Sequence, residues 1–134
     1  MNNNDIVERR FFDIAGSTLS VIDHGDGPAV LLGHGYLWDW RMWQPQIEAL
    51  QKRFRLIVPE MWGHGRSGVM PGGTQSLADV AAQMLALMDA LEIEEFTVIG
   101  SSMGGMWGAH LAALAPKRVH GLAVLNSYLG EEPL

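Results

Sequence analysis

The sequence of 134 residues contains no cysteine, and this absence excludes disulfides, thiolate catalysis and cysteine-based zinc sites. Charged residues make up only 18% of it, and acidic residues outnumber lysine and arginine by 15 to 9. No basic run occurs, so the net charge of −6 argues against nucleic acid or an anionic membrane surface as a partner. Long apolar runs are also missing, because none approaches the ~18 residues that cross a bilayer.

Hydrophobic residues make up 48% of the sequence, which predicts a globular domain with a buried core. Residues 1–5 lack the basic flank and apolar run of a signal peptide, so we expect a cytoplasmic protein. The sequence contains neither a metal-ligand cluster nor a phosphate-binding glycine loop, so we expect no cofactor and no metal.

Short apolar runs without alternation are typical of strands in a parallel sheet that is covered on both faces. Such runs lie at 29–33, 55–59, 96–100 and 121–125. Two further strands, at 9–14 and 18–23, are predicted to form an antiparallel hairpin. Helices are predicted at 43–52, 76–91 and 103–115. This order predicts an α/β fold with a mostly parallel sheet, an N-terminal antiparallel hairpin and helices on both faces.

The segment Gly100-Ser101-Ser102-Met103-Gly104 fits the pattern G-x-S-x-G between a buried strand and a helix. A sharp turn at this place forces the central residue toward positive φ, and its neighbours two positions away must lack bulk. Only Ser102 has glycine at both of these positions, so Ser102 is the candidate nucleophile rather than Ser101. The Met103 N–H lies at a helix N-terminus, where it can bind a developing oxyanion.

Two further glycine-containing loops follow strands and are expected at the same end of the sheet. Gly33-His34-Gly35-Tyr36 follows the strand at 29–33, and the Tyr36 N–H is the candidate second oxyanion donor. The other loop, at 59–68, contains three glycines and His64. We predict that His34 and His64 hold these loops by hydrogen bonds and do not act as the general base.

Together, these segments resemble the α/β-hydrolase fold, among the esterases and lactonases with a His-Gly oxyanion loop. The resemblance implies a nucleophile at the end of the fifth strand and a triad of serine, acid and histidine. It assigns Ser102 as nucleophile and the N–H groups of Tyr36 and Met103 to the oxyanion hole. The matching pieces are LLGHGYLWDWRMW, IVPEMWGHGRSG, VIGSSMGGMWGAHLA and PKRVHGLAVLN.

Two departures from the family pattern are visible. Glu60, Met61 and Trp62 stand where the family usually carries an aspartate and a pair such as Arg-Gly. The family's triad acid and histidine come after the sixth strand and a cap, so the resemblance implies that they lie beyond Leu134. Residues 1–134 are therefore expected to form the N-terminal part of one α/β-hydrolase domain, truncated after the sixth strand, with an exposed sheet edge at 119–125.

The expected function is hydrolysis of a carboxylic ester through an acyl-enzyme on Ser102, with little activity from these 134 residues alone. Carbon–carbon bond hydrolysis, perhydrolysis and a non-catalytic binding role remain alternatives. Trp38, Trp62 and Met106 are the candidate substrate-binding residues and favour a small apolar ester. The expected partner is a complementary C-terminal half or a second copy that pairs at the exposed edge.

Overall fold

The computed structural model describes residues 7–130, which form one six-stranded sheet with helices on both faces. β1 and β2 form a hairpin, in which Ala15 and Gly16 both have positive φ, as a type I′ turn requires. The strands are β1 (Arg9–Ile14), β2 (Ser17–Gly25), β3 (Ala29–Gly33), β4 (Arg55–Pro59), β5 (Phe96–Ser101) and β6 (Val119–Leu125). The helices are the 3-10 turn η1 (Trp40–Trp43), α1 (Gln44–Leu50), α2 (Leu77–Ala90) and α3 (Met103–Leu114).

The sheet has the strand order β1-β2-β4-β3-β5-β6. β1 pairs antiparallel with β2 and β2 with β4, whereas the pairs among β4, β3, β5 and β6 are all parallel. The predicted mostly parallel sheet with an N-terminal antiparallel hairpin is therefore confirmed. In this register Gly33 at the end of β3 pairs with Gly100 near the end of β5, so the loops that follow start side by side.

Local sequence signals explain where the helices begin and end. Ser76 and Asp79 form a capping box at the start of α2, because each side chain accepts a bond from the other residue's backbone N–H. α3 ends at Leu114, two residues before Pro116, which cannot continue a helix. The predicted helix at 43–52 is shorter in the structure, and η1 precedes it with Asp39 as its N-cap.

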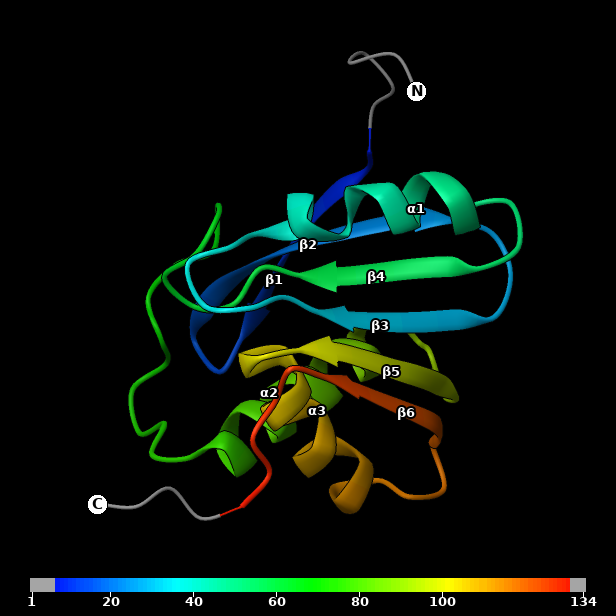
Figure 1. Cartoon of the computed structure of the whole chain (residues 1–134). Helices are drawn as coiled ribbons and strands as arrows, with labels where there is room; N and C mark the ends of the chain where they lie inside the picture. The colour runs from blue at the N-terminus through cyan, green and yellow to red at the C-terminus, as the bar shows by residue number, and fades with distance from the viewer. Residues whose placement is uncertain (1–6, 131–134) are drawn as a thin grey trace.

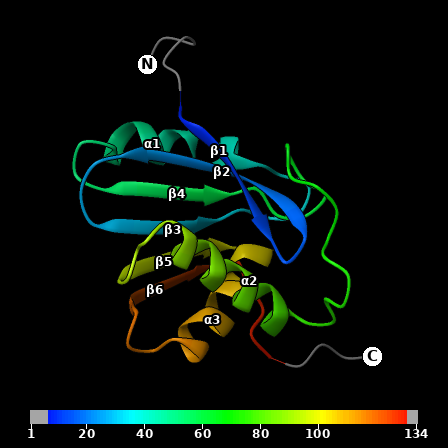
Figure 2. The same cartoon turned by 180° about the vertical axis from the view of Figure 1, so that it is seen from behind.

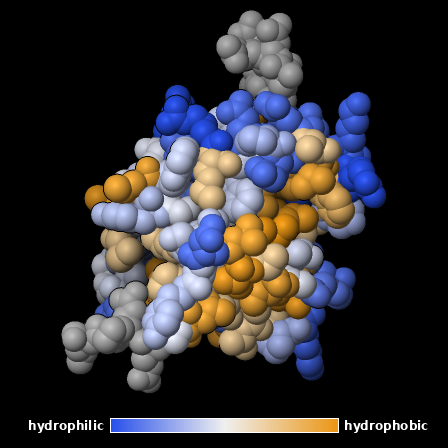
Figure 3. Space-filling model, viewed as in Figure 1, coloured by the Kyte–Doolittle hydropathy of each residue, from blue (hydrophilic) through white to orange (hydrophobic). Residues whose placement is uncertain are grey.

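The two faces of the sheet bury separate clusters. α1 covers β2, β4 and β3 on one face, where Trp43 and Ile47 pack onto the strands. α2 and α3 cover the other face and pack with the strands to form the larger cluster, in which Met84 and Trp107 are fully buried (Figures 1 and 2). Among residues 7–130, no helix covers β5 and β6 on the face that carries α1, and apolar side chains gather there on the surface (Figure 3).

β6 ends the sheet within the described part of the chain, because it pairs with β5 alone. Leu122 and Leu125 on this strand are 41% and 47% exposed. The expected exposed edge is therefore present among residues 7–130. In the same range, the helices fall short of the length and hydropathy of a membrane span.

Candidate active site

Ser102 lies at the turn between β5 and α3 and has a strained backbone. Its φ of 54° and ψ of −119° fall outside the regions that side-chain-bearing residues normally occupy. Ser102 is exposed, whereas Ser101 before it is buried. The turn therefore presents the Ser102 side chain at the carboxyl end of the sheet and at the N-terminus of α3.

Glycines at positions 100 and 104 permit this turn because backbones meet there directly. A Cβ added to Gly100 would lie 2.3 Å from the carbonyl oxygen of Gly104. A Cβ added to Gly104 would lie 2.3 Å from the carbonyl carbon and oxygen of Gly33. The expectation that neighbours two positions from Ser102 must lack bulk is therefore confirmed. Gly104 must lack a side chain for a second reason as well, because the backbone of β3 lies against it.

Both backbone polar groups of Ser102 are bound by the segment at the end of β6. The Ser102 N–H donates to the carbonyl oxygen of Leu125 at 2.8 Å. The Ser102 carbonyl oxygen accepts from the N–H groups of Gly105 (3.0 Å) and Met106 (3.1 Å) and from the Ser127 hydroxyl (2.7 Å). No local sequence pattern indicated the contact between Ser127 and Ser102.

The two segments that carry the candidate oxyanion donors both adjoin Ser102. Met103 is the first residue of α3, so its N–H has no acceptor within the helix and lies at the positive end of the helix dipole. The loop after β3 runs beside Ser102, since a Cβ added to Gly35 would lie 3.5 Å from the Ser102 Cβ. Tyr36 is the next residue and is 66% exposed. The structure thus brings Ser102, Met103 and the residue preceding Tyr36 together.

His34 and His64 connect the loop after β3 with the loop after β4, and each bonds across to the other loop. His34 is buried, and its Nε2 accepts from the Met61 N–H at 2.8 Å. His64 Nε2 accepts from the Leu37 N–H at 3.0 Å. Because these Nε2 atoms accept, Nδ1 carries the proton in both rings. It donates to the Gly35 oxygen from His34 at 2.8 Å and to the Trp62 oxygen from His64 at 2.9 Å.

These bonds explain why neither histidine is suited to take a proton from Ser102. Burial lowers the pKa of His34 below its ordinary value, although the bond to the Gly35 carbonyl acts in the opposite direction. Both ring nitrogens of His34 and of His64 already have backbone partners. The structural role predicted for the two residues is therefore confirmed by their hydrogen bonds.

The candidate substrate-binding residues differ in their exposure. Trp38 is 60% exposed, and its Cδ1 would lie 3.8 Å from a Cβ added to Gly35, beside Ser102. Met106 is half-buried, one turn into α3. Trp62 is only 4% exposed and donates from its indole to Gln83 on α2 at 2.8 Å. The structure therefore places Trp62 in the core between the β4 loop and α2, away from a surface that a substrate could reach.

Glu60 begins the loop after β4 and is 1% exposed. Its carboxylate forms an ion pair with Arg9 of β1 and accepts from the Ser20 hydroxyl at 2.9 Å and the Arg66 N–H at 3.2 Å. A Cβ at Gly65 would lie 1.8 Å from this carboxylate, so Gly65 makes room for it. Glu60 thus anchors the loop that carries His64. The sequence showed this residue as a departure from the family pattern but did not show its partners.

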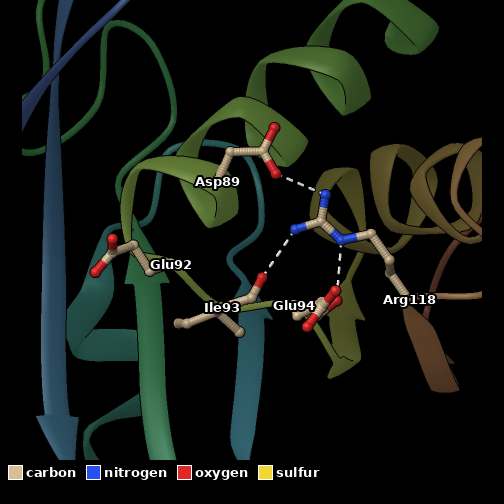
Figure 4. A pocket seen from close by; sticks show the side chains of 5 residues that line it. All are labelled: Asp89, Glu92, Ile93, Glu94 and Arg118. Carbon is tan, nitrogen blue, oxygen red and sulfur yellow. Dashed lines mark hydrogen bonds and ion pairs between the residues drawn. The ribbon is translucent and has the colours of Figure 1, made fainter.

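The surface of residues 7–130 includes two hollows of interest. One, of about 260 Å³, follows α3 from Met106 to Ala113 and is bordered by residues 128–130. The larger, of about 380 Å³, lies at the opposite end of the sheet, where the Arg118 guanidinium donates to Asp89 (2.6 Å) and to the carbonyl oxygens of Ile93 and Glu94 (Figure 4). Only the first hollow borders the α3 turn that follows Ser102.

A mostly parallel sheet with an exposed, strained serine between a strand and a helix defines the class of α/β hydrolases. Residues 28–133 match the family described as the alpha/beta hydrolase fold, and the chain belongs to this family. The match covers both glycine loops and the turn at Ser102. The predicted family is therefore confirmed.

The chain is similar to several hydrolases. It is 38% identical over 78% of its length to a RutD protein of Azorhizobium caulinodans that is named for carbamate hydrolysis. It is 35% identical over 84% of its length to 3-oxoadipate enol-lactonase 1 of Acinetobacter baylyi. A crystal structure of a hydrolase from Pseudomonas aeruginosa PA01 superposes with a TM-score of 0.86, at 31% identity over 98% of the chain. The chain spans 39%, 42% and 49% of these three proteins, less than half of each.

Proposed function

We propose that the whole protein is a serine hydrolase of carboxylic esters and that Ser102 is its nucleophile. The observation that carries this proposal is the backbone of Ser102, whose φ of 54° holds an exposed hydroxyl at the N-terminus of α3. Similarity to an enol-lactonase supports the substrate class, because a lactone is a cyclic ester.

The proposed reaction begins with attack of the Ser102 oxygen on the ester carbonyl, while a base takes the hydroxyl proton. The N–H groups of Tyr36 and Met103 stabilise the resulting oxyanion. The tetrahedral intermediate expels the alcohol, which receives the proton, and water then releases the acid from the acyl-enzyme. The base must be a group other than His34 or His64, because backbone groups occupy both nitrogens of each ring.

The side chains near Ser102 favour a small apolar substrate. Trp38 is exposed and Met106, one turn into α3, is half-buried, and neither side chain carries a charge. Trp62 is left out of this proposal because it is buried against Gln83. Carbon–carbon bond cleavage and perhydrolysis use the same nucleophile, so product analysis with a β-diketone or with peroxide would separate them from ester hydrolysis.

Labelling by a fluorophosphonate probe tests the proposal, because the probe reacts only with an activated serine. We expect the whole protein to be labelled and Ser102→Ala to lose the label. Ser101→Ala is the matched control, since it removes the neighbouring hydroxyl and should keep the label. An unlabelled whole protein would reject the hydrolase proposal in favour of a non-catalytic binding protein. The expected cytoplasmic location stays a prediction, which cell fractionation would test.

We further propose that residues 1–134 alone hydrolyse esters very slowly and need a partner at the β6 edge. A serine without a base beside it is a poor nucleophile, and an apolar edge such as β6 favours pairing with another strand. The partner would be a complementary C-terminal half or a second copy of the chain. Sedimentation of the purified chain tests this, because a well-folded monomer would contradict it.

A further inference from the structure

The end of β6 contacts the turn at Ser102 through a side chain that the proposed reaction has not used. The Ser127 hydroxyl donates to the carbonyl oxygen of Ser102 at 2.7 Å, two residues after β6 ends. The same oxygen also accepts from the N–H groups of Gly105 and Met106, which belong to the first turns of α3. Ser127 is thus the third donor to this oxygen, and it comes from a distant part of the sequence.

The carbonyl of Ser102 and the N–H of Met103 belong to one peptide group. This group is planar and trans, so its oxygen and its N–H point in opposite directions. A donor that fixes the oxygen therefore also fixes the direction of the Met103 N–H. We propose that Ser127 is a positioning residue that aims the Met103 N–H at the oxyanion, acting through the Ser102–Met103 peptide group. This inference rests on the proposed function.

The hydrogen bond from Ser127 also affects the strength of the Met103 N–H as a donor. A carbonyl that accepts hydrogen bonds becomes more polarised, and the N–H of the same peptide group then donates more strongly. Ser102 receives a second bond from the same segment, because its own N–H donates to Leu125. The end of β6 thereby holds the peptide groups on both sides of Ser102.

Gly105 makes room for this contact. A Cβ at Gly105 would lie 2.1 Å from the Ser127 oxygen and 3.0 Å from the Gly100 oxygen. The φ of Gly105 is not positive, so its backbone conformation does not require glycine. Close approach of Ser127 and Gly100 therefore explains why a second glycine follows Gly104.

A purely structural role for Ser127 is the alternative, since its hydroxyl also lies 3.0 Å from the Leu125 oxygen. A hydroxyl has one proton, and the 2.7 Å contact with Ser102 is the shorter of the two. The two roles differ in what they change. Loss of an oxyanion-positioning bond lowers kcat and leaves KM unchanged, whereas loss of stability lowers the melting temperature and the amount of active protein.

The test compares Ser127→Ala and Ser127→Thr in the whole protein, with p-nitrophenyl acetate as the substrate. We expect about a tenfold lower kcat for Ser127→Ala, with KM changed by less than about twofold, since one hydrogen bond is lost. Ser127→Thr keeps the hydroxyl and should restore most of kcat. Ser17→Ala, in the β1–β2 hairpin at the other edge of the sheet, is the matched control and should resemble the wild type.

Active-site titration with the fluorophosphonate probe corrects kcat for misfolded protein. A second readout is the ¹⁵N resonance of Met103, which responds to hydrogen bonding at the carbonyl of its own peptide group and should move in Ser127→Ala but not in Ser127→Thr. Unchanged kcat in Ser127→Ala, or equal losses in the two variants, would overturn the role of Ser127. If the wild-type protein neither reacts with the probe nor cleaves the ester, the proposed function itself fails, and this inference fails with it.

Discussion

The two ends of the sheet each contain an exposed non-glycine residue with positive φ, and their surroundings differ. Glu92, at the amino end, has a φ of 58° and follows the last residues of α2. Its N–H donates to the carbonyl oxygen of Asp89, and the N–H of Ile93 donates to the carbonyl oxygen of Met88. These bonds satisfy the last carbonyl groups of α2 and have no role beyond terminating the helix. Strain at Glu92 is therefore a local consequence of how α2 terminates.

Ser102, at the carboxyl end, has a similar φ of 54° but a ψ of −119°, far from the ~+47° of the left-handed region. Leu125 and Ser127, more than twenty residues away in the sequence, bind its backbone. Positive φ alone therefore does not mark a functional residue. A functional candidate is indicated when distant segments hold the strained residue and its side chain remains exposed.

The largest expected effect is at the carboxyl end, at Gly104. Gly104→Ala places a Cβ 2.3 Å from the backbone of Gly33, and no flexible side chain can move aside. We expect a loss of about 4 kcal/mol or more in the free energy of unfolding, or no folding at all. Gly72→Ala is the matched control, because nothing lies within 4 Å of its added Cβ. Chemical denaturation of the whole protein measures both variants, and equal stabilities would contradict the close packing of α3 on β3.

The next largest effect is expected at His34, which holds the two loops beside Ser102. His34→Ala leaves the Met61 N–H and the Gly35 carbonyl without their partner in a buried place. We expect a loss of about 2–3 kcal/mol in the free energy of unfolding. His120→Ala is the control, since His120 is exposed and lies 3.5 Å from Glu95. A loss as small as that of the control would show that the loops hold together without His34.

The pH dependence of stability gives a second test of the role of His34 in holding the two loops. The pKa of His34 is lower in the folded protein than in the unfolded chain, so the unfolded chain binds the proton first as pH falls. The stabilisation is complete above the unfolded pKa of about 6.5 and decreases as the pH falls below it. We expect His34→Gln to reduce the slope of stability against pH below 6.5 in urea titrations. An unchanged slope would assign the acid sensitivity to other groups.

Much of this architecture follows from patterns that each lie within a single short segment of the sequence. The four apolar runs became the parallel strands, and Ser76 with Asp79 formed the capping box at α2. Ser102 could be identified because its steric requirement lies within five consecutive residues, Gly100 to Gly104. Such features depend on local backbone geometry, which neighbouring residues determine.

The features that the sequence did not reveal depend on contacts between distant segments. Ser127 reaches Ser102 only because β6 pairs with β5. Glu60 forms its ion pair with Arg9 because the sheet places β1, β2 and β4 next to one another. Trp62 follows a strand at the same end as Ser102, but its direction depends on where α2 places Gln83. A loop tryptophan has the same sequence pattern whether it faces the core or a substrate.

The smallest effect is expected at the amino end, at Arg118. Arg118→Ala removes the bonds to Asp89 and to the Ile93 and Glu94 carbonyls, all of them near solvent (Figure 4). We expect a loss of about 1 kcal/mol in stability, because water can replace partly exposed bonds. Kcat should stay unchanged, since the site lies at the opposite end of β5 from Ser102. Lys117→Ala, at the exposed neighbouring residue, is the control for stability. A fall in kcat for Arg118→Ala would show that the two ends of the sheet are coupled. It would contradict the view that the amino end affects stability alone and the carboxyl end contains the active site.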